Sequence, residues 1–166
     1  MPLQSIMPLT LTYLSDQKIP RAYAIERTCQ AEPWDPDSFE RTLRHKSVIG
    51  TVAEHRGKVV GYMVYGFREH QIELLRIGVL PAQQRRGVGS EMVARLLTKL
   101  RPDERPQICT IVPEESLGVQ LFLRRWGFRA TSIAAHHFGD DQNGYRFGYD
   151  LRVAEIIEER HIRGEC

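Results

Sequence analysis

The spacing of apolar residues changes along this chain, and the change is sharpest in the stretch at residues 73–97. Its first part is a run of mostly apolar residues typical of a strand. After a polar turn, apolar residues recur at the spacing of one helix face, at Met92, Val93, Leu96 and Leu97. The stretch therefore predicts a strand, a turn and a helix in direct succession.

The same reading extends over the rest of the chain and predicts alternating strands and helices. Further strands are predicted at residues 9–13, 48–54, 59–67, 107–112, 129–138 and 145–153, and the central strand is expected to begin near residue 71. Further helices are predicted at residues 19–30, from 37 or 38 to 44, at 117–126 and at 154–163.

Single residues sharpen some of these boundaries. Leu9, Leu11 and Tyr13 alternate with Thr10 and Thr12, a pattern that suits a half-buried edge strand. Asp16 is expected to cap the first helix, and Ser116 the helix at residues 117–126. Gly127 is expected to end the helix at residues 117–126.

No internal repeat or low-complexity linker interrupts this pattern in the 166 residues. We therefore predict one α/β domain over residues 1–166, with a tail at about 1–8 and a C-terminal extension at about 154–166. A chain of this length buries roughly two thirds of its unfolded surface without help from a metal or a disulfide.

Composition and charge narrow the class of function. The chain has 23 basic and 21 acidic residues, well mixed, and a formal net charge of +2, so nucleic acid is not an expected partner. No apolar run approaches the length of a membrane span. The three cysteines, Cys29, Cys109 and Cys166, lack the spacing of a zinc site or a disulfide framework. We expect no metal, no membrane partner and a reducing, cytoplasmic location.

The polar turn before the central helix carries the candidate chemistry. Gly87 and Gly89 follow a pair of arginines where a helix begins, and free N–H groups and the helix dipole favour an anion there. Met92 stands where a dinucleotide fold has its third glycine, and the G-K-[ST] ending of a triphosphate loop is absent. A pyrophosphate site made of backbone N–H groups fits best.

The residues around this turn resemble a known family. The run from Ile77 to Pro81, followed by the run from Gln84 to Gly89, is similar to the acetyl-CoA signature Q/R-x-x-G-x-G/A of the GNAT N-acetyltransferases. The pair Gly127-Phe128 resembles the end of a later helix in that family. Ala31 to Trp34 is similar to the ribosomal-protein-alanine N-acetyltransferase branch. The resemblance implies a mixed, mostly antiparallel, twisted α/β (α+β) sheet flanked by helices and splayed between the fourth and fifth strands.

The resemblance also implies acetyl-CoA as the cofactor. The backbone of residues 77–79 would pair with the pantetheine arm, and the amides of residues 85–90 would hold the pyrophosphate. The cofactor-binding residues are then Ile77, Gly78, Val79, Gln84, Arg85, Arg86, Gly87, Val88, Gly89, Ser90 and Ser116. The alternatives are a plain core strand at residues 77–79 and a solvated basic pair at Arg85 and Arg86.

The catalytic residues depart from the family pattern. Leu123 stands where the resemblance implies a tyrosine acid, and Ile111 where the ribosomal-protein branch has a glutamate base. Glu73 lies where histone-acetylating members of the family carry a base, and a carboxylate there can take the proton of an amine. Its alternative role is that of an exposed strand glutamate paired to an arginine such as Arg76.

Substrate is expected opposite the cofactor, at Trp34 and Tyr145. Tyr145, Tyr149, His136 and His137 are other conceivable acids or bases, although such residues are more often structural. The neighbouring segments are acidic, which suits a cationic amine or a basic peptide, but turns are rich in such residues anyway. The acidic residues concerned are Glu32, Asp35, Asp37, Asp140 and Asp141.

These residues predict an N-acetyltransferase that moves an acetyl group from acetyl-CoA to a primary amine by direct attack. A protein N-terminal α-amine or a small amine is favoured, because an α-amine of pKa about 7.8 is roughly one third neutral at pH 7.5, against about 0.1% of a lysine. The alternative is a catalytically inactive acyl-CoA-binding or regulatory module. The chain is expected to be a monomer or a homodimer.

Overall fold

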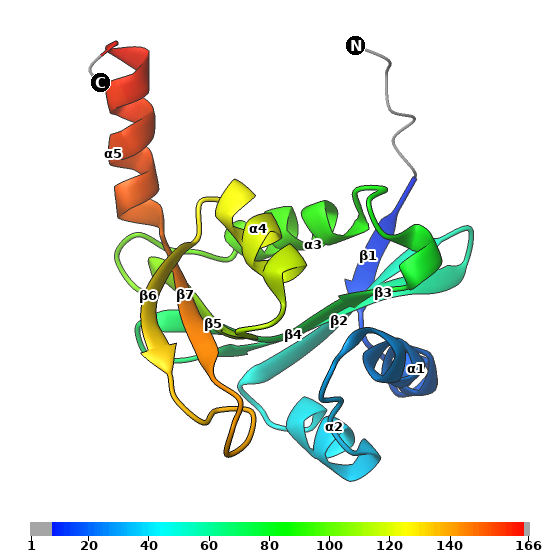
Figure 1. Cartoon of the computed structure of the whole chain (residues 1–166). Coiled ribbons are helices and arrows are strands. Elements are labelled where there is room, and N and C mark those ends of the chain that lie inside the picture. Colours follow the sequence, from blue (N-terminus) through cyan, green and yellow to red (C-terminus); the bar gives the residue numbers. More distant parts are fainter. Residues whose placement is uncertain (1–7, 165–166) are drawn as a thin grey trace. The chain divides into compact units, whose positions relative to one another are not determined.

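The computed structural model describes residues 8–164, which form seven strands with helices on both faces (Figure 1). The strands are β1 (Thr10–Tyr13), β2 (Val48–His55), β3 (Lys58–Phe67), β4 (Gln71–Val79), β5 (Gln107–Pro113), β6 (Arg129–Ala134) and β7 (Gly144–Asp150). The helices are α1 (Ile19–Cys29), α2 (Pro36–Leu43), α3 (Val88–Leu97), α4 (Leu117–Arg125) and α5 (Leu151–Ile162), with short 3-10 turns η1 (Asp16–Lys18) and η2 (Pro81–Gln83).

The strands form one open sheet in the order β1-β2-β3-β4-β5-β7-β6. The pairs β1–β2, β2–β3, β5–β7 and β6–β7 are antiparallel, whereas β4 and β5 are parallel. The predicted mixed, mostly antiparallel sheet is therefore confirmed. Apart from Pro8, the predicted tail lies outside the described residues.

The chain divides into two compact units. The first comprises Met1–Gly66 and Leu74–Thr98, and the second Phe67–Glu73 and Lys99–Cys166. Strand β4 contributes to both, because the division falls between Glu73 and Leu74.

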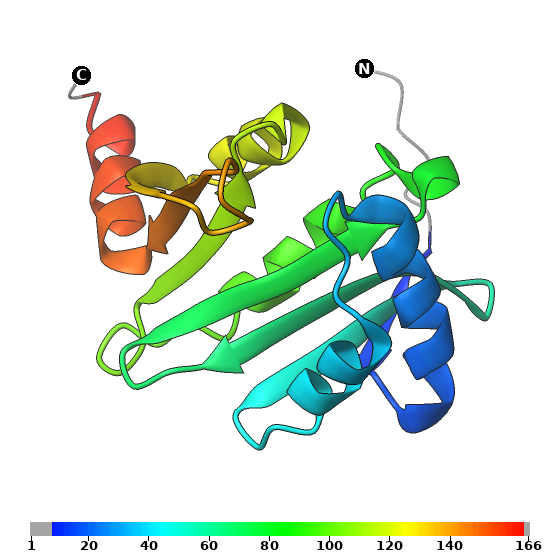
Figure 2. The ribbon, with the colours of Figure 1, turned by 60° about the horizontal axis from the view of Figure 1, so that its bottom comes forward.

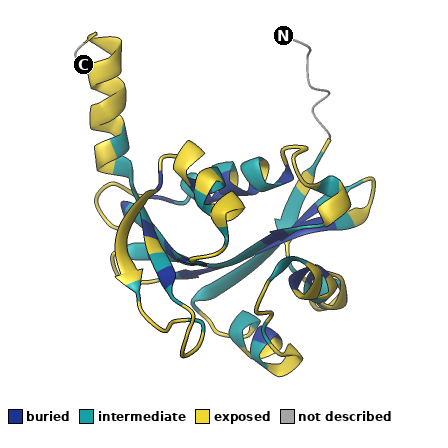
Figure 3. Ribbon diagram, in the orientation of Figure 1, coloured by how far each residue is buried: buried dark blue, intermediate teal, exposed yellow. Residues whose placement is uncertain are grey.

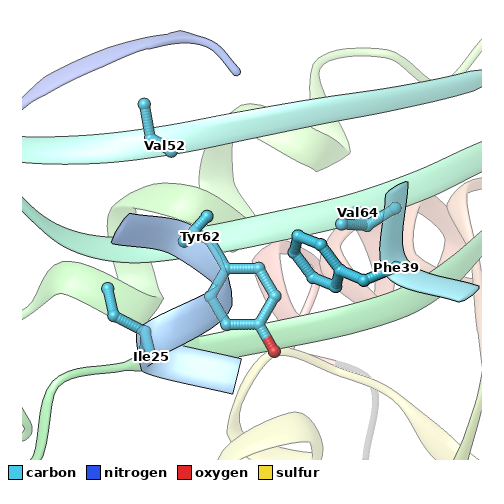
Figure 4. Packing of buried hydrophobic residues seen from close by; sticks show 6 residues of the cluster. Ile25, Phe39, Val52, Tyr62 and Val64 are labelled. Atoms are coloured by element: carbon cyan, nitrogen blue, oxygen red, sulfur yellow. The ribbon is translucent and has the colours of Figure 1, made fainter. Parts of the chain in front are cut away.

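In the first unit, α1 and α2 cover one face of the strands and α3 covers the other (Figures 1 and 2). Ala22 and Ile25 of α1 lie on the side of the helix that faces the sheet, as their spacing predicts, and both are buried. They pack in a cluster with Phe39 of α2 and Tyr62 of β3, whose ring centroids are 5.9 Å apart (Figure 4). This cluster fixes the two helices against the strands.

The beginnings of α1 and α2 differ from the prediction. Asp16 starts the 3-10 turn η1 instead of capping α1, whose N-cap residue is Lys18. Asp35 is the N-cap residue of α2, and its carboxylate accepts a hydrogen bond of 2.9 Å from the Ser38 amide. The carboxylate that meets the free amides of α2 therefore comes from the residue before Pro36.

Strand β1 is the edge of the sheet, as predicted, but Tyr13 does not share the burial of Leu11. Its side chain is 70% exposed, whereas Leu11 and Thr12 are half-buried. Since β1 has four residues and pairs only with β2, alternation within it is a weak guide to burial.

In the second unit, β6, β7 and β5 form an antiparallel ladder, and α5 follows directly on β7. Strand β6 ends at Ala134, earlier than predicted, and α5 begins at Leu151 instead of residue 154. The early start has a local cause, because the Asp150 carboxylate accepts a hydrogen bond of 3.0 Å from the Arg152 amide. No helix of the described residues is long and apolar enough to cross a membrane.

Candidate active site

The turn between β4 and α3 is open at the start of the helix. Gly87 precedes α3 in the left-handed conformation, with φ of 87°, and a side chain added there would meet no atom within 4 Å. Arg85 also has a positive φ, of 60°. Two left-handed residues within three positions turn the chain sharply, and they expose its backbone to a ligand.

The first amides of α3 are available to an anion. The first helical hydrogen bond is donated by Glu91 to the Gly87 carbonyl, at 3.0 Å. The amides of Val88, Gly89 and Ser90 precede it and find no acceptor in the described part of the chain. Arg85 and Arg86 are exposed beside them. Free amides, a helix N-terminus and two cations fit a pyrophosphate.

The edge of β4 is the second part of the candidate cofactor site. The Leu80 amide donates a hydrogen bond of 2.9 Å to Val60 of β3. Because backbone groups alternate along a strand, Ile77 and Val79 turn theirs to the opposite edge. Their carbonyls accept hydrogen bonds from the side chains of Gln30, Cys29 and Gln84, at 2.9, 2.9 and 3.1 Å. No hydrogen bond from their two amides is seen in the described part of the chain, so these amides can pair with an extended ligand.

Gln84 and Gly78 have structural tasks within this site. Gln84 ties the turn to the end of β4 through Val79. Gly78 faces α1, and a Cβ atom there would lie 2.5 Å from the Tyr62 ring. Only a glycine lets Tyr62 pack against β4 at this point. Both residues thus shape the site without presenting a side chain to a ligand.

Glu73 stands where the parallel pairing of β4 with β5 ends. The register pairs Gln71 with Gln107 and stops at Glu73 and Cys109. Arg68 contacts the Glu73 carboxylate through Nε at 2.8 Å and Nη2 at 2.7 Å, and both contacts go to Oε2. The arginine partner is therefore Arg68 and not Arg76. Oε1 is not used by Arg68.

Cys109 lies beside Glu73 and is a half-buried thiol. Burial raises its pKa, and the negative charge of Glu73 raises it further. The thiol therefore stays protonated at neutral pH, which does not favour it as a nucleophile.

Helix α4 carries Leu123 at the position where the resemblance implies a tyrosine acid. Leu123 is 1% exposed, and its carbonyl accepts a hydrogen bond of 3.1 Å from the Phe128 amide. Gly127, with φ of 86°, donates to the Arg124 carbonyl at 3.0 Å. These bonds close the C-terminus of α4 as a Schellman motif, so the predicted role of Gly127 is confirmed. Ser116 is the N-cap residue, but its side chain makes no capping hydrogen bond.

Trp34, the predicted substrate residue of the first unit, is held firmly in the loop between α1 and α2. Its amide donates to Glu26 Oε1 at 2.9 Å, and its carbonyl accepts from the Tyr23 hydroxyl at 3.0 Å. The guanidinium of Arg76 lies over its ring, 4.4 Å from the centroid. Arg76 also donates to the Glu32 carbonyl at 3.2 Å.

Glu26 is the residue that our sequence reasoning missed. It is completely buried and accepts hydrogen bonds from Trp34 and from the Tyr62 hydroxyl. Gln30 donates to both Tyr62 and the Ile77 carbonyl, so one network joins the Trp34 loop to the candidate cofactor edge. The available signal was its spacing, since Glu26 lies four residues after Ala22 on the inward face of α1.

The hairpin loop of the second unit contains the remaining candidates. The Tyr145 hydroxyl donates to Glu114 at 3.3 Å, and the charge of Glu114 raises the pKa of the phenol of this half-buried residue. His136 contacts the Asp140 carbonyl, and His137 packs edge-on against Phe138. Tyr149 packs against Phe128, which fits the structural role foreseen for it. Among residues 8–164, no cluster of His, Cys, Asp or Glu could hold a metal.

Known proteins share this arrangement. The chain has the fold of acetyltransferases with a parallel β4–β5 pair in an open mixed sheet. Residues 19–128 match the Acetyltransferase (GNAT) family, and the chain belongs to that family. It is 37% identical over 83 residues to acetyltransferase plu1384 of Photorhabdus laumondii, an alignment that covers 49% of this chain and 58% of the relative. The alignments with this relative and two further acetyltransferases span 58 to 66% of the relatives' own lengths.

Solved structures agree in fold at low identity. The ribosomal-protein-S18-alanine N-acetyltransferase of Escherichia coli matches with a TM-score of 0.78 at 18% identity, over 87% of this chain and 94% of its own. A GNAT acetyltransferase of Elizabethkingia anophelis with acetyl-CoA bound matches with a TM-score of 0.73 at 16% identity, over 86% and 98%.

Proposed function

We propose that this protein is an acetyl-CoA-dependent N-acetyltransferase whose acceptor is a primary amine. The observation that carries the proposal is the open turn before α3, where Gly87 is left-handed and the amides of Val88, Gly89 and Ser90 have no acceptor among the described residues. A helix that only packs in the core does not need a start with free, exposed amides. A pyrophosphate can bind to such amides.

In this proposal the first unit binds and aligns the cofactor. The amides of residues 85–90 hold the pyrophosphate, and Arg85 and Arg86 add positive charge. The amides of Ile77 and Val79 bind the pantetheine arm as an added strand would. Acetyl-CoA supplies an activated thioester. Aligning it with an amine provides effective molarities of about 10⁵–10⁸ M, which is the larger part of the rate enhancement.

Glu73 is the proposed general base. The amine nitrogen attacks the thioester carbonyl carbon, the C–S bond breaks, and Oε1 of Glu73 takes the amine proton directly or through water. Arg68 holds the other oxygen, Oε2, and so fixes the orientation of the carboxylate. Since Leu123 cannot donate a proton, the leaving thiolate takes its proton from solvent.

The acceptor proposed here is a protein N-terminal α-amine or a small amine. The proposed site has one general base and no general acid. An α-amine needs less general-base catalysis than a lysine, because far more of the α-amine is neutral at pH 7.5. Trp34 is proposed to line the acceptor site, together with Tyr145. The cytoplasmic location stays a prediction from the cysteines.

Calorimetry with acetyl-CoA, followed by CoA release from a panel of amines and peptides, tests the proposal. We expect binding, turnover, and a loss of about 10²–10⁴-fold in kcat/KM for Glu73→Gln with unchanged acetyl-CoA affinity. Glu69→Gln is the matched control, because Glu69 is an exposed carboxylate in the turn before β4. Absence of acetyl-CoA binding at millimolar concentration would refute the proposal.

A second candidate function is a non-catalytic acyl-CoA-binding or regulatory module. The observation that favours it is the buried Leu123 in place of an acid, together with the engagement of Glu73 by Arg68. The same panel separates the two functions. Acetyl-CoA binding without turnover on any acceptor, unaffected by Glu73→Gln, identifies the module.

A further inference from the structure

Helix α5 leaves its apolar residues uncovered. None of its residues is buried, and Figure 3 shows the helix exposed along most of its length. Val153, Ile156 and Ile157 are 44, 53 and 46% exposed. An isolated helix of twelve residues is marginal in water, so this helix needs a partner surface to be stable.

The second unit contains a groove that α5 itself helps to form. Helix α4 makes one wall with Leu117 and Leu121, and α5 makes the other with Val153 and Ile157. The strands β5, β6 and β7 form its floor. Its volume is about 1520 Å³. A helix of twelve residues, about 10 Å wide, occupies roughly 1,400 Å³. The groove is therefore large enough to hold one helix such as α5.

The groove also carries positive charge that has no partner. Four arginines line it, two at the end of α4 and two on the strands, and none forms an ion pair within the described chain. They are Arg124, Arg125, Arg129 and Arg146. Two carboxylates also line the groove, Glu158 and Asp150, and Asp150 pairs with Arg152, so positive charge predominates and favours an acidic occupant.

Helix α5 has the complementary charge. Residues 153–159 contain three glutamates and no basic residue, and none of the glutamates forms an ion pair in the part of the chain that the structure describes. They are Glu155, Glu158 and Glu159. Apolar and acidic side chains thus share one helix, as apolar and basic side chains share the groove.

We propose that the protein is a homodimer in which α5 of each subunit lies in the groove of the other. Val153, Ile157 and His161 line the groove, so this stripe of one α5 would pack against the same stripe of its partner. Glu155 and Glu159 lie on the opposite face of the helix by their spacing, and Ile156 lies at the border between the two faces, three residues after Val153. That face would meet the partner's α4.

This arrangement closes as a symmetric dimer. Each subunit gives one helix and one groove, so the two contacts are equivalent and the helices lie in the order α4, partner α5, α5, partner α4. Ile156 packs on the partner's Leu121, and Glu155 and Glu159 approach the partner's Arg124 and the partner's Arg125. The inference concerns assembly and does not depend on the proposed activity.

Sedimentation velocity and light scattering of the full chain test the dimer. We expect a mass twice that of one chain for the wild type. Leu121→Glu and Ile157→Glu should each raise the dimer dissociation constant by more than about tenfold. Val119→Glu is the matched control, because Val119 is 41% exposed on α4 but does not line the groove, and it should leave the dimer intact. Circular dichroism verifies that each variant is folded.

Charge reversal gives a sharper test that leaves the core untouched. The double variants Glu155→Arg/Glu159→Arg and Arg124→Glu/Arg125→Glu should each be mainly monomeric. Mixed together they should form heterodimers, because each α5 then meets a partner groove of opposite charge. A monomeric wild type at all accessible concentrations, a dimer insensitive to Leu121→Glu and Ile157→Glu, or a mixture that stays monomeric would overturn the proposal.

Discussion

The carboxylate of Glu26 faces the guanidinium of Arg76 inside the first unit, with 3.3 Å between Oε1 and Nε. The two side chains are 0 and 14% exposed. Arg76 Nε is buried and finds no hydrogen-bond partner within residues 8–164, so the contact is an electrostatic attraction that lacks hydrogen-bond geometry. Through this pair, α1 and β4 together hold the Trp34 loop that the proposed acceptor would meet.

Glu26→Gln should lower the free energy of unfolding by about 3–5 kcal/mol, because it leaves the positive charge of Arg76 buried without its counter-charge. Urea denaturation measures the change. Adding Arg76→Met should recover part of the loss, since both charges are then removed. The exposed pair of Arg68 and Glu73 is the control, and Glu73→Gln should cost about 0–1 kcal/mol. Equal losses for Glu26→Gln and Glu73→Gln would contradict the burial of the first pair.

Gly78→Ala should destabilise the protein by about 1–3 kcal/mol, because its Cβ would lie 2.5 Å from Cε1 of the fully buried Tyr62. Gly118→Ala provides the comparison within α4. Nothing lies within 4 Å of a Cβ at Gly118, and alanine is the better helix former, so a gain of about 0.5–1 kcal/mol is expected. Thermal unfolding monitored by circular dichroism distinguishes the two signs.

Arg85→Ala/Arg86→Ala should weaken acetyl-CoA binding by about tenfold or more and reduce its salt dependence, because charge-assisted contacts to phosphate are lost. Arg56→Ala is a close control. Arg56 is also exposed with a positive φ, of 50°, but it lies in the β2–β3 turn and should not affect binding. If Arg85 and Arg86 are instead solvated and do not contact the ligand, calorimetry should show an unchanged affinity for acetyl-CoA.

Asp150→Asn should weaken α5 at neutral pH and lose its effect in acid. A hydrogen bond from the Arg152 side chain, followed by one from Gln107, lowers the pKa of Asp150 from 3.8 to about 2. The stabilisation from its charged form is therefore complete above about pH 4 and disappears as the pH falls toward 2. The free energies of unfolding of the wild type and the variant, measured across this pH range, should become equal at its acid end. A difference that persists below pH 2 would argue against this linkage.

Much of the fold was predictable because local patterns and tertiary demands agree in it. The spacing of Met92, Val93 and Leu96 on α3 matches their burial, and Gly127 ends α4 as its position predicts. Prediction failed where one local signal competed with another. Asp35 and Asp150 cap their helices while Asp16 does not, since the backbone conformation around each carboxylate decides which one reaches free amides.

The candidate site was only partly predictable from sequence. The glycine turn is a local feature, so the order of Arg85 to Gly89 was enough to predict its shape. The partner of Glu73 was not, because Arg68 and Arg76 are both near in sequence and the strand geometry selects between them. Glu26 was missed because a glutamate among apolar residues of a helix gives no sign of being buried until Tyr62 and Arg76 surround it.

By itself, the sequence determined the order of strands and helices, the turn that opens α3 and the absence of a tyrosine at Leu123. These follow from the spacing and type of residues close together in the chain. Only the tertiary structure decided which carboxylate pairs with which arginine, that Glu26 is buried, and that the apolar face of α5 is left uncovered. The burial of Glu26 and the exposure of α5 depend on residues far apart in sequence, and the choice of Arg68 for Glu73 depends on strand geometry; no local pattern encodes either.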